Sequence, residues 1–347
     1  GRYCGPRLNV NRELMMKKRY AIPLLMAFLP LPALAVVCSN AAGGTSEVFY
    51  DLTDSFTSAN NQVGQVKVLT KNFSERVEGI CPVHSGNNQT MRSYVANMPV
   101  VETEGSYKYL QLNDYLRGAM SITDSSAGTF YPPQDYVLMG THPNVTKGKP
   151  FGIMDSNFTF RLKVTRRFVD QVVIPKKTLF TVYVTTANTD PLSTPVYTIS
   201  YSGIINVPQQ CKVGVNDIVV INFGKIGSQL FSQAGAGNKP ATVNKKLENI
   251  AIQCTNVEAK AYLTLRIEAE KVNGNMIVSD NPDVGFIVGD QNGNALTPNN
   301  IGSVIPFQLD GAGSARTAIT AWPVSVTGNK PKEGVFQSRG YLRVDYE

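Results

Sequence analysis

An amide and a carboxylate stand two residues apart in the segment TTANTDP, where Asn188 and Asp190 follow Thr186. A site for a hydroxyl-rich ligand such as a hexose needs donors and acceptors in fixed pairs, because each hydroxyl both donates and accepts. Asn188 and Asp190 supply both kinds. The same residue types favour turns for backbone reasons, so a plain turn before Pro191 is the alternative interpretation.

A pair of acidic residues raises the possibility of catalysis. Glu102 and Glu104, in VETEG, would lie on one face of a strand about 7 Å apart, a separation comparable to that of the carboxylates in glycosidases. Acidic residues at this spacing are more often a solvent-exposed face. The two histidines, His84 and His142, stand in no metal motif and in no Ser/His/Asp arrangement. We therefore predict no enzyme activity, no metal site and no cofactor.

The first 35 residues are expected to precede the folded protein. Residues 1–14 begin with Gly, and we interpret them as upstream sequence that is not part of the native protein. Residues 15–35 combine a basic stretch, an apolar run and small residues at Ala33 and Ala35, which is typical of a secretory signal peptide. The apolar run is shorter than the roughly 20 residues of a membrane-spanning helix. We predict cleavage after Ala35, which leaves Val36 with a free amine.

Removal of this leader changes the charge of the protein. The whole chain has 33 Lys and Arg residues against 26 Asp and Glu residues. The leader holds six of the basic residues and one acidic residue, which leaves a formal charge of +2 on the remainder. Nucleic acid is therefore not a predicted partner.

Four cysteines remain after the leader, an even number in a chain that is expected to be exported. Cys38 and Cys81 are 43 residues apart, and so are Cys211 and Cys254. Three connectivities are possible. The long gap in the middle favours one disulfide in each of two domains, each worth roughly 4 kcal/mol by loop-closure entropy.

The pattern between the ends predicts an all-β protein. Short alternating or β-branched runs are separated by turn residues, and long helical periodicity is absent. We expect one helical turn after Asn113. The clearest expected strands are residues 180–186, 196–207, 217–224, 250–254 and 262–270.

The size of the chain and one break in it suggest two β-sandwiches. Residues 208–210, PQQ, separate a strand that ends at Val207 from a strand that begins at Cys211. This divides the exported chain into residues 36–207 and residues 211–347, both of which suit immunoglobulin-like sandwiches.

The last residues, FQSRGYLRVDYE, predict a strand that ends the chain. One face carries apolar side chains and the other carries Arg339, Tyr341, Arg343 and Asp345. An apolar terminal strand leaves a sheet edge open to pairing with another chain. An ordinary final strand of a sandwich is the alternative.

Several long blocks then show a specific resemblance. The chain resembles the type 1 fimbrial tip adhesins, closest to their Salmonella-type form, which are two-domain adhesins of chaperone/usher pili. The resemblance implies an elongated lectin-type immunoglobulin-like domain that binds mannose, followed by an incomplete immunoglobulin-like pilin domain that lacks its last strand. The blocks are FYDLTDSFTSANNQVGQV, LNDYLRGAMSITDSSAGTFYPP, STPVYTISYSG, LFSQAGAGNKP and AWPVSVTGNKP.

The resemblance also implies site residues, by chain order. Sugar contacts would come from the N-terminal amine, from the loop after Cys81 and from a late strand-loop. The candidates are Val36, His84, Asn88, Ser93, Thr186, Asn188 and Asp190. The chain departs from the Escherichia-type relatives at Val36, where those have an aromatic residue, and after Cys81, where no acidic residue follows.

The C-terminal tail resembles the segment that chaperone/usher subunits use for assembly. It would be recognised by a periplasmic chaperone and would then accept a strand from the next subunit. The residues implied are Gly334, Phe336, Gly340, Leu342, Val344 and Tyr346. The expected partners are mannosylated host glycoproteins, the chaperone, the outer-membrane usher and the adjacent fimbrial subunit. The expected location is the fimbrial tip, and a non-adhesive structural minor subunit is the alternative.

Overall fold

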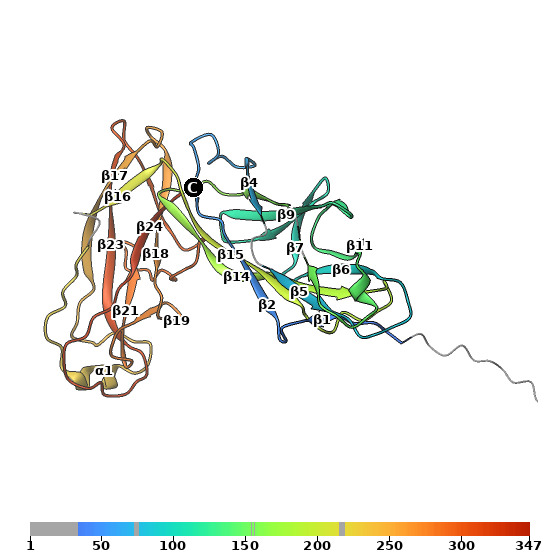
Figure 1. Ribbon diagram of the computed structural model, residues 1–347. Coiled ribbons are helices and arrows are strands. Elements are labelled where there is room, and N and C mark those ends of the chain that lie inside the picture. The colour runs from blue at the N-terminus through green and yellow to red at the C-terminus, as the bar shows by residue number, and fades with distance from the viewer. Residues whose placement is uncertain (1–33, 73–75, 154, 156, 215–218) are drawn as a thin grey trace, which may run out of the picture. The chain divides into compact units, whose positions relative to one another are not determined.

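The computed structural model describes residues 34–72, 76–153, 155, 157–214 and 219–347. The regular secondary structure of these residues is almost all strand, in two β-sandwiches that follow one another along the chain (Figure 1). The prediction of an all-β protein of two sandwiches is confirmed. The upstream segment 1–14 and residues 15–33 of the predicted signal peptide lie outside the described residues.

Two large sheets build the first sandwich. One has the order β11-β6-β14-β15-β2, with the short β3 also paired to β15. Its strands are β2 (Ser46–Asp51), β3 (Asp54–Ser55), β6 (Gln89–Ala96), β11 (Gln134–Thr141), β14 (Gln171–Thr185) and β15 (Tyr197–Asn206). The other has the order β4-β13-β9-β8-β7, with β10 paired to β9. Its strands are β4 (Val66–Asn72), β7 (Val100–Glu104), β8 (Tyr107–Gln111), β9 (Leu116–Asp124), β10 (Gly128–Phe130) and β13 (Asn157–Val164).

A small third sheet contains the first strand of the described residues. It comprises β1 (Ser39–Asn40), β5 (Val77–Ile80) and β12 (Phe151–Ile153), in the order β1-β5-β12. A short 3₁₀ helix, η1 (Pro143–Val145), precedes β12. The disulfide Cys38–Cys81 joins the segments on either side of this sheet, as predicted.

Alternation of side chains explains why these segments become strands. In β13, NFTFRLKV, the apolar residues Phe158, Phe160, Leu162 and Val164 are all buried and the polar residues between them face outward. Period-2 alternation buries one face of a strand and leaves the other in water. The buried faces of the first sandwich form a single apolar core that includes Tyr94, Phe180 and Ile199.

The second sandwich has a six-stranded and a three-stranded sheet. The first has the order β16-β17-β23-β21-β20-β19. Its strands are β16 (Gln210–Val213), β17 (Lys246–Thr255), β19 (Val272–Asn273), β20 (Met276–Val278), β21 (Val284–Gly289) and β23 (Ser314–Ser325). The second has the order β22-β18-β24, with β18 (Tyr262–Glu268), β22 (Ile305–Gln308) and β24 (Tyr341–Tyr346). Cys211 on β16 pairs with Cys254 on β17 and forms the second predicted disulfide.

Two predictions about local structure are wrong. The helical turn expected after Asn113 is a bend that leads into β9, because the Asn113 side-chain oxygen accepts from the backbone N–H groups of Tyr115 and Leu116. The strand expected at 217–224 lies partly outside the described residues, and its described part, 219–224, pairs with no strand. A short helix, α1 (Ser228–Ala234), follows instead and buries Phe231.

Candidate carbohydrate-binding site

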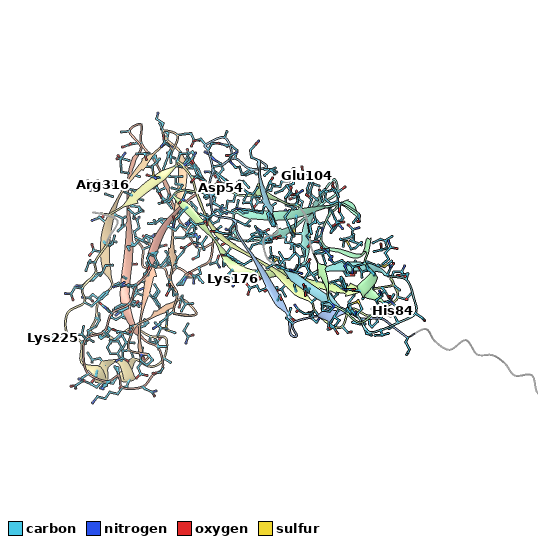
Figure 2. All side chains as sticks on the ribbon, viewed as in Figure 1. Asp54, His84, Glu104, Lys176, Lys225 and Arg316 are labelled. Carbon is cyan, nitrogen blue, oxygen red and sulfur yellow. A yellow bond between two sulfur atoms is a disulfide. The ribbon has the colours of Figure 1, made fainter. Side chains whose placement is uncertain are left out.

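Two of the predicted sugar-binding loops emerge from the same end of the first sandwich. β14 ends at Thr185, and β6 begins at Gln89. The two strands are antiparallel, with Met91 opposite Thr185, so the loop that follows β14 and the loop that precedes β6 leave the sheet together. Figure 2 shows His84, from the second of these loops, at the end of the sandwich where the described chain begins.

The N-terminal segment joins the loops at this end. Val37 forms a bridge with Thr185, and the backbone N–H of Cys38 donates to the Val184 carbonyl at 3.0 Å. Val36 is half-buried and packs against the apolar core. The disulfide then holds Cys38 to Cys81, which begins the other loop. Segments that are far apart in the sequence therefore converge on one small region at this end of the sandwich.

The loop from Thr186 to Asp190 is organised around one carboxylate. Asp190 is 5% exposed, and its Oδ2 accepts from the backbone N–H groups of Ala187 at 2.9 Å and Thr186 at 3.2 Å. The Asp190 side chain thus holds the turn, as the alternative interpretation of TTANTDP proposed. Its Oδ1 has no hydrogen-bond partner among the described residues, and Asn188 is exposed. One carboxylate oxygen of Asp190 therefore organises the loop, and the Asn188 amide lies on the surface.

Ser93 lies below this loop rather than on its surface. Its side chain is fully buried, and its Oγ accepts from the backbone N–H of Tyr136 at 2.8 Å. The Tyr136 hydroxyl donates to the Asp190 carbonyl at 2.6 Å. Ser93 and Asp190 are therefore connected through Tyr136, a residue that the sequence analysis did not identify.

His84 and Asn88 belong to the second loop. The imidazole Nδ1 of His84 lies 2.8 Å from the Pro82 carbonyl, and its Nε2 lies 3.2 Å from the Asn87 carbonyl. Both ring nitrogens therefore contact the loop itself. The carbonyl of Asn88 accepts from the His142 N–H at 3.0 Å, and its side chain is exposed. Asn88 is thus open to a ligand, whereas His84 shapes the loop.

A buried charged cluster lies in the core of the same sandwich. Arg92 Nη1 donates to Asp155 Oδ1 at 2.5 Å, and the Tyr94 hydroxyl donates to the same oxygen at 2.6 Å. The Tyr197 hydroxyl donates to Asp155 Oδ2. Asp155 follows β12 of the small sheet, whereas Arg92 and Tyr94 lie on β6 and Tyr197 lies on β15. The cluster therefore connects the small sheet to the large sheet that contains β6 and β15.

The protonation states in this cluster follow from burial and charge. Burial raises the pKa of Tyr94 and of Tyr197 well above the ordinary value, and the nearby Asp155 carboxylate raises both further. Both phenols therefore stay neutral and act as donors. Burial by itself would lower the pKa of Arg92, but the charge of Asp155 prevails and raises it well above its ordinary value. The guanidinium therefore remains a cation.

The acidic pair considered for catalysis is engaged in ion pairs on the opposite sheet. Glu102 and Glu104 both contact the ammonium of Lys163, and Glu102 also contacts Arg117 at 2.8 Å. Hydrogen bonds from Lys163 and Arg117 lower the pKa of Glu102. A carboxylate held in its charged form is poorly suited to donate a proton, so this pair has the character of a surface ion-pair network.

The described residues contain no group of three or more His, Cys, Asp or Glu side chains placed to hold a metal ion. Among the same residues, none of the helices has the length and apolar character needed to cross a membrane.

The predicted assembly residues lie on or before β24, in the second sandwich. In the described sheets β24 pairs with β18, and along its other edge the structure has one isolated bridge, between Asp345 and Phe168. Val344 and Tyr346 are buried in the core and Leu342 packs against it, as the alternation predicted. Asp345 is also buried, which the sequence did not predict, because its carboxylate accepts from Arg266 Nε at 2.7 Å and from the Tyr115 hydroxyl.

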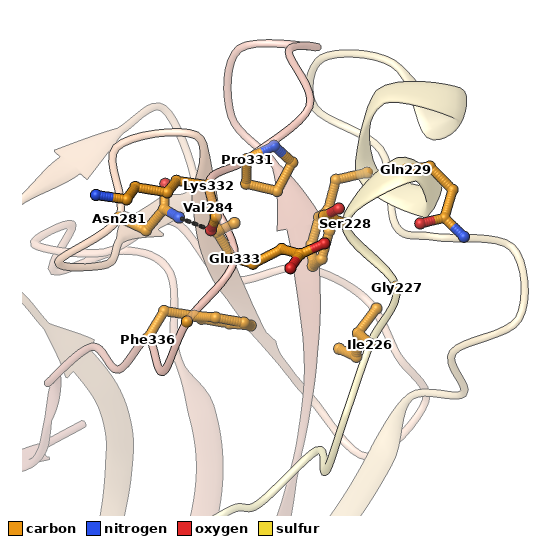
Figure 3. Close-up of a pocket in the computed structure, with 12 residues that line it drawn as sticks. Ile226, Gly227, Ser228, Gln229, Asn281, Val284, Pro331, Lys332, Glu333 and Phe336 are labelled. Carbon is orange, nitrogen blue, oxygen red and sulfur yellow. Dashed lines mark hydrogen bonds between the residues drawn. The ribbon is translucent and has the colours of Figure 1, made fainter.

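The segment before β24 lines a pocket beside α1. Figure 3 shows the ring of Phe336 on one side of this pocket and Ile226 on the other. Phe336 stacks on Phe286 with ring centroids 5.8 Å apart. Gly334 also lines the pocket and has a φ of +146°, a conformation that side chains rarely adopt. Gly340 is constrained differently, since a Cβ there would lie 2.9 Å from Ile267 Cδ1.

Comparison with known proteins identifies the class to which these two sandwiches belong, that of fimbrial subunits. Residues 199–347 match the family model described as Fimbrial protein. The chain is 58% identical over 321 residues to the type 1 fimbrin D-mannose specific adhesin of Salmonella typhimurium, covering 92% of this chain and 96% of that protein. This protein belongs to the type 1 fimbrial adhesin family.

Other relatives are more distant. The probable minor fimbrial subunit LpfD of Escherichia coli O157:H7 is 26% identical, with 89% of this chain and 92% of that protein covered. Among solved structures, the CupB6 tip adhesin of Pseudomonas aeruginosa covers 89% of this chain and 94% of its own, with 12% identity and a TM-score of 0.29.

Proposed function

We propose that this protein is a fimbrial tip adhesin that binds terminal mannose on host glycoproteins. Residues 36–207 form the lectin domain, residues 208–210 the linker and residues 211–347 the pilin domain. The observation that carries the proposal is the 58% identity, over nearly the full length of both chains, to a relative named for D-mannose specificity.

The geometry at the end of the first sandwich supports this proposal. Asn188 and the Oδ1 of Asp190 offer a donor and acceptors from one loop, and Asn88 offers another amide from the neighbouring loop. Cleavage after Ala35 would add the positive charge of the Val36 amine at the same end. Paired donors and acceptors of this kind suit vicinal sugar hydroxyls. His84 and Ser93 stabilise the loops through hydrogen bonds to Pro82 and Tyr136, and the backbone N–H of Thr186 donates to the Asp190 carboxylate within the turn.

The second sandwich joins the protein to the fimbria. The edge of β24 that precedes the Asp345–Phe168 bridge accepts a strand, first from a periplasmic chaperone and then, at the outer-membrane usher, from the adjacent subunit. The segment 219–224 supports this role, because Val219 and Ile221 pack against the same core as Leu342. That segment makes no backbone–backbone hydrogen bond to another described residue. An inserted strand would satisfy its exposed N–H and C=O groups together with those of β24. The assembled protein then stands at the fimbrial tip on the cell surface.

Titration of methyl α-mannoside into purified residues 36–207 tests the lectin function, with methyl α-galactoside as the control sugar. This part has a large apolar core of its own, which supports its use as a fragment, while its Val169 packs in the core of residues 211–347. We expect saturable binding of the mannoside and none of the galactoside. Absence of mannoside binding by a folded fragment would favour the alternative of a non-adhesive minor subunit; the 26% identical relative is named a probable minor fimbrial subunit.

A further inference from the structure

Tyr136 adopts a backbone conformation that is unusual for an aromatic residue. Its φ is +52°, in the left-handed region that side chains other than Asn, Asp and Gly rarely occupy. The pairing of β11 with β6 is irregular at this point, between Gln134 and Val137. Strained residues of this kind persist only where the surrounding structure holds them, and they are concentrated at functional sites.

Two hydrogen bonds hold Tyr136 in this conformation. Its backbone N–H donates to the buried Oγ of Ser93 at 2.8 Å, and its hydroxyl donates to the Asp190 carbonyl at 2.6 Å. Ser93 lies in the middle of β6 and is paired with Tyr183 on β14, so the first of these hydrogen bonds attaches Tyr136 to the sheet. The second attaches Tyr136 to the loop that carries the candidate sugar contacts.

That loop depends on Tyr136 for its connection to the rest of the fold. The other printed bonds of residues 186–190 stay within the loop or reach the adjoining Thr185, as with Asp190 Oδ2 to Ala187 N. Among the described residues, the Tyr136 hydroxyl is the only group outside 185–190 that forms a hydrogen bond with this loop. Without it, the loop would be free to sample more orientations relative to β6 and β14.

We propose that Tyr136 is the positioning residue of the mannose site. The strained backbone of Tyr136 directs its phenol toward the loop from Thr186 to Asp190. The hydroxyl then holds this loop in a single conformation, in which Asn188 and Asp190 face the ligand. A loop ordered before binding loses less conformational freedom when the sugar binds, so the bond strengthens binding without touching the ligand. This inference rests on the proposed function.

The test uses the mature chain purified in complex with its chaperone and measures methyl α-mannoside affinity and the melting temperature of the first sandwich. Tyr136→Phe removes only the hydroxyl, and we expect an affinity loss of about two- to tenfold from one net hydrogen bond. Tyr136→Asn relieves the positive φ while removing the hydroxyl. We expect it to lose at least as much affinity, with an unchanged or raised melting temperature. Tyr107→Phe is the control, since the Tyr107 hydroxyl makes no hydrogen bond with the described residues, and its affinity should equal that of the wild type.

A loss of affinity without a loss of stability distinguishes positioning from a structural role, which would lower the melting temperature and leave the affinity of the folded protein unchanged. The inference is overturned if Tyr136→Phe binds within twofold of the wild type. It is also overturned if Tyr136→Asn keeps full affinity. If the wild type itself binds no mannoside, the proposed function is refuted. This outcome is distinct from refutation of the Tyr136 inference, because it is seen with the wild type alone.

Discussion

Replacement of Asp155 by Asn should show how strongly the buried ion pair stabilises the first sandwich. The change keeps the shape of the side chain and removes its charge. Arg92 is 6% exposed and Asp155 fully buried, so the variant leaves a cation in the core without a counter-charge. Loss of one partner from a buried pair costs about 3–5 kcal/mol. For a domain of this size, that corresponds to a fall in melting temperature of roughly 6–20 °C.

The measurement is a double-mutant cycle on residues 36–207, with Asp155→Asn, Arg92→Met and the double variant. Far-ultraviolet circular dichroism in urea gives the free energy of unfolding, since the chain has one tryptophan, Trp322, and it lies in the second sandwich. The double variant leaves no charge unpaired, so its cost should be less than the two single costs combined, by about 2 kcal/mol.

Glu47 provides the matched control, because its ion pair with Lys176 is exposed. Glu47→Gln should change the free energy of unfolding by about 0–1 kcal/mol. The reasoning is refuted if the single costs of Asp155→Asn and Arg92→Met add to within about 0.5 kcal/mol of the double variant, since independent sites behave in that way.

Three further predictions concern the sugar site, assembly and acid sensitivity. Asp190→Asn should lose roughly 1.5–3 kcal/mol of mannoside binding, about ten- to hundredfold, because a charge-assisted bond becomes neutral; equal affinities in a titration would remove Asp190 from the site. Deletion of residues 340–347 removes β24 and should abolish co-purification with the chaperone; normal co-purification would show that the chaperone binds another segment. The pKa of Glu102 is lowered in the fold, so its ion pairs stabilise at neutral pH and are lost as the pH falls through that lowered pKa. Glu102→Gln should therefore reduce the loss of stability between neutral and acid pH in thermal melts, and an unchanged pH dependence would contradict this.

Much of the fold could be predicted from local pattern. The strand expected at residues 250–254 lies within β17, where the alternate residues Ile250, Ile252 and Cys254 are buried in the core. The equal spacing of the cysteines favoured the pairing that the structure contains. Such features depend on side-chain period and chain order, which a sequence states directly. The expected turn after Asn113 was wrong because two hydrogen bonds to the Asn113 side chain redirect the backbone into a strand.

The candidate site was only partly predictable. The residue types at Asn188 and Asp190 indicated a polar site or a turn, and the structure shows that the Asp190 carboxylate organises the turn while Asn188 stays exposed. The sequence could not indicate Tyr136. Its role depends on a positive φ and on two partners, Ser93 and Asp190, that lie 43 and 54 residues away.

The sequence by itself determined the all-β class, the disulfide spacing and the apolar terminal strand, because each is a property of neighbouring or regularly spaced residues. Tertiary structure alone decided that Arg92 and Asp155 form a buried pair and that Asp345 is buried beside Arg266. A charge enters a core only when folding brings a counter-charge and hydrogen-bond donors to it from distant strands. No local pattern records that convergence, because the partners are separated by 63 residues in the first pair and by 79 in the second.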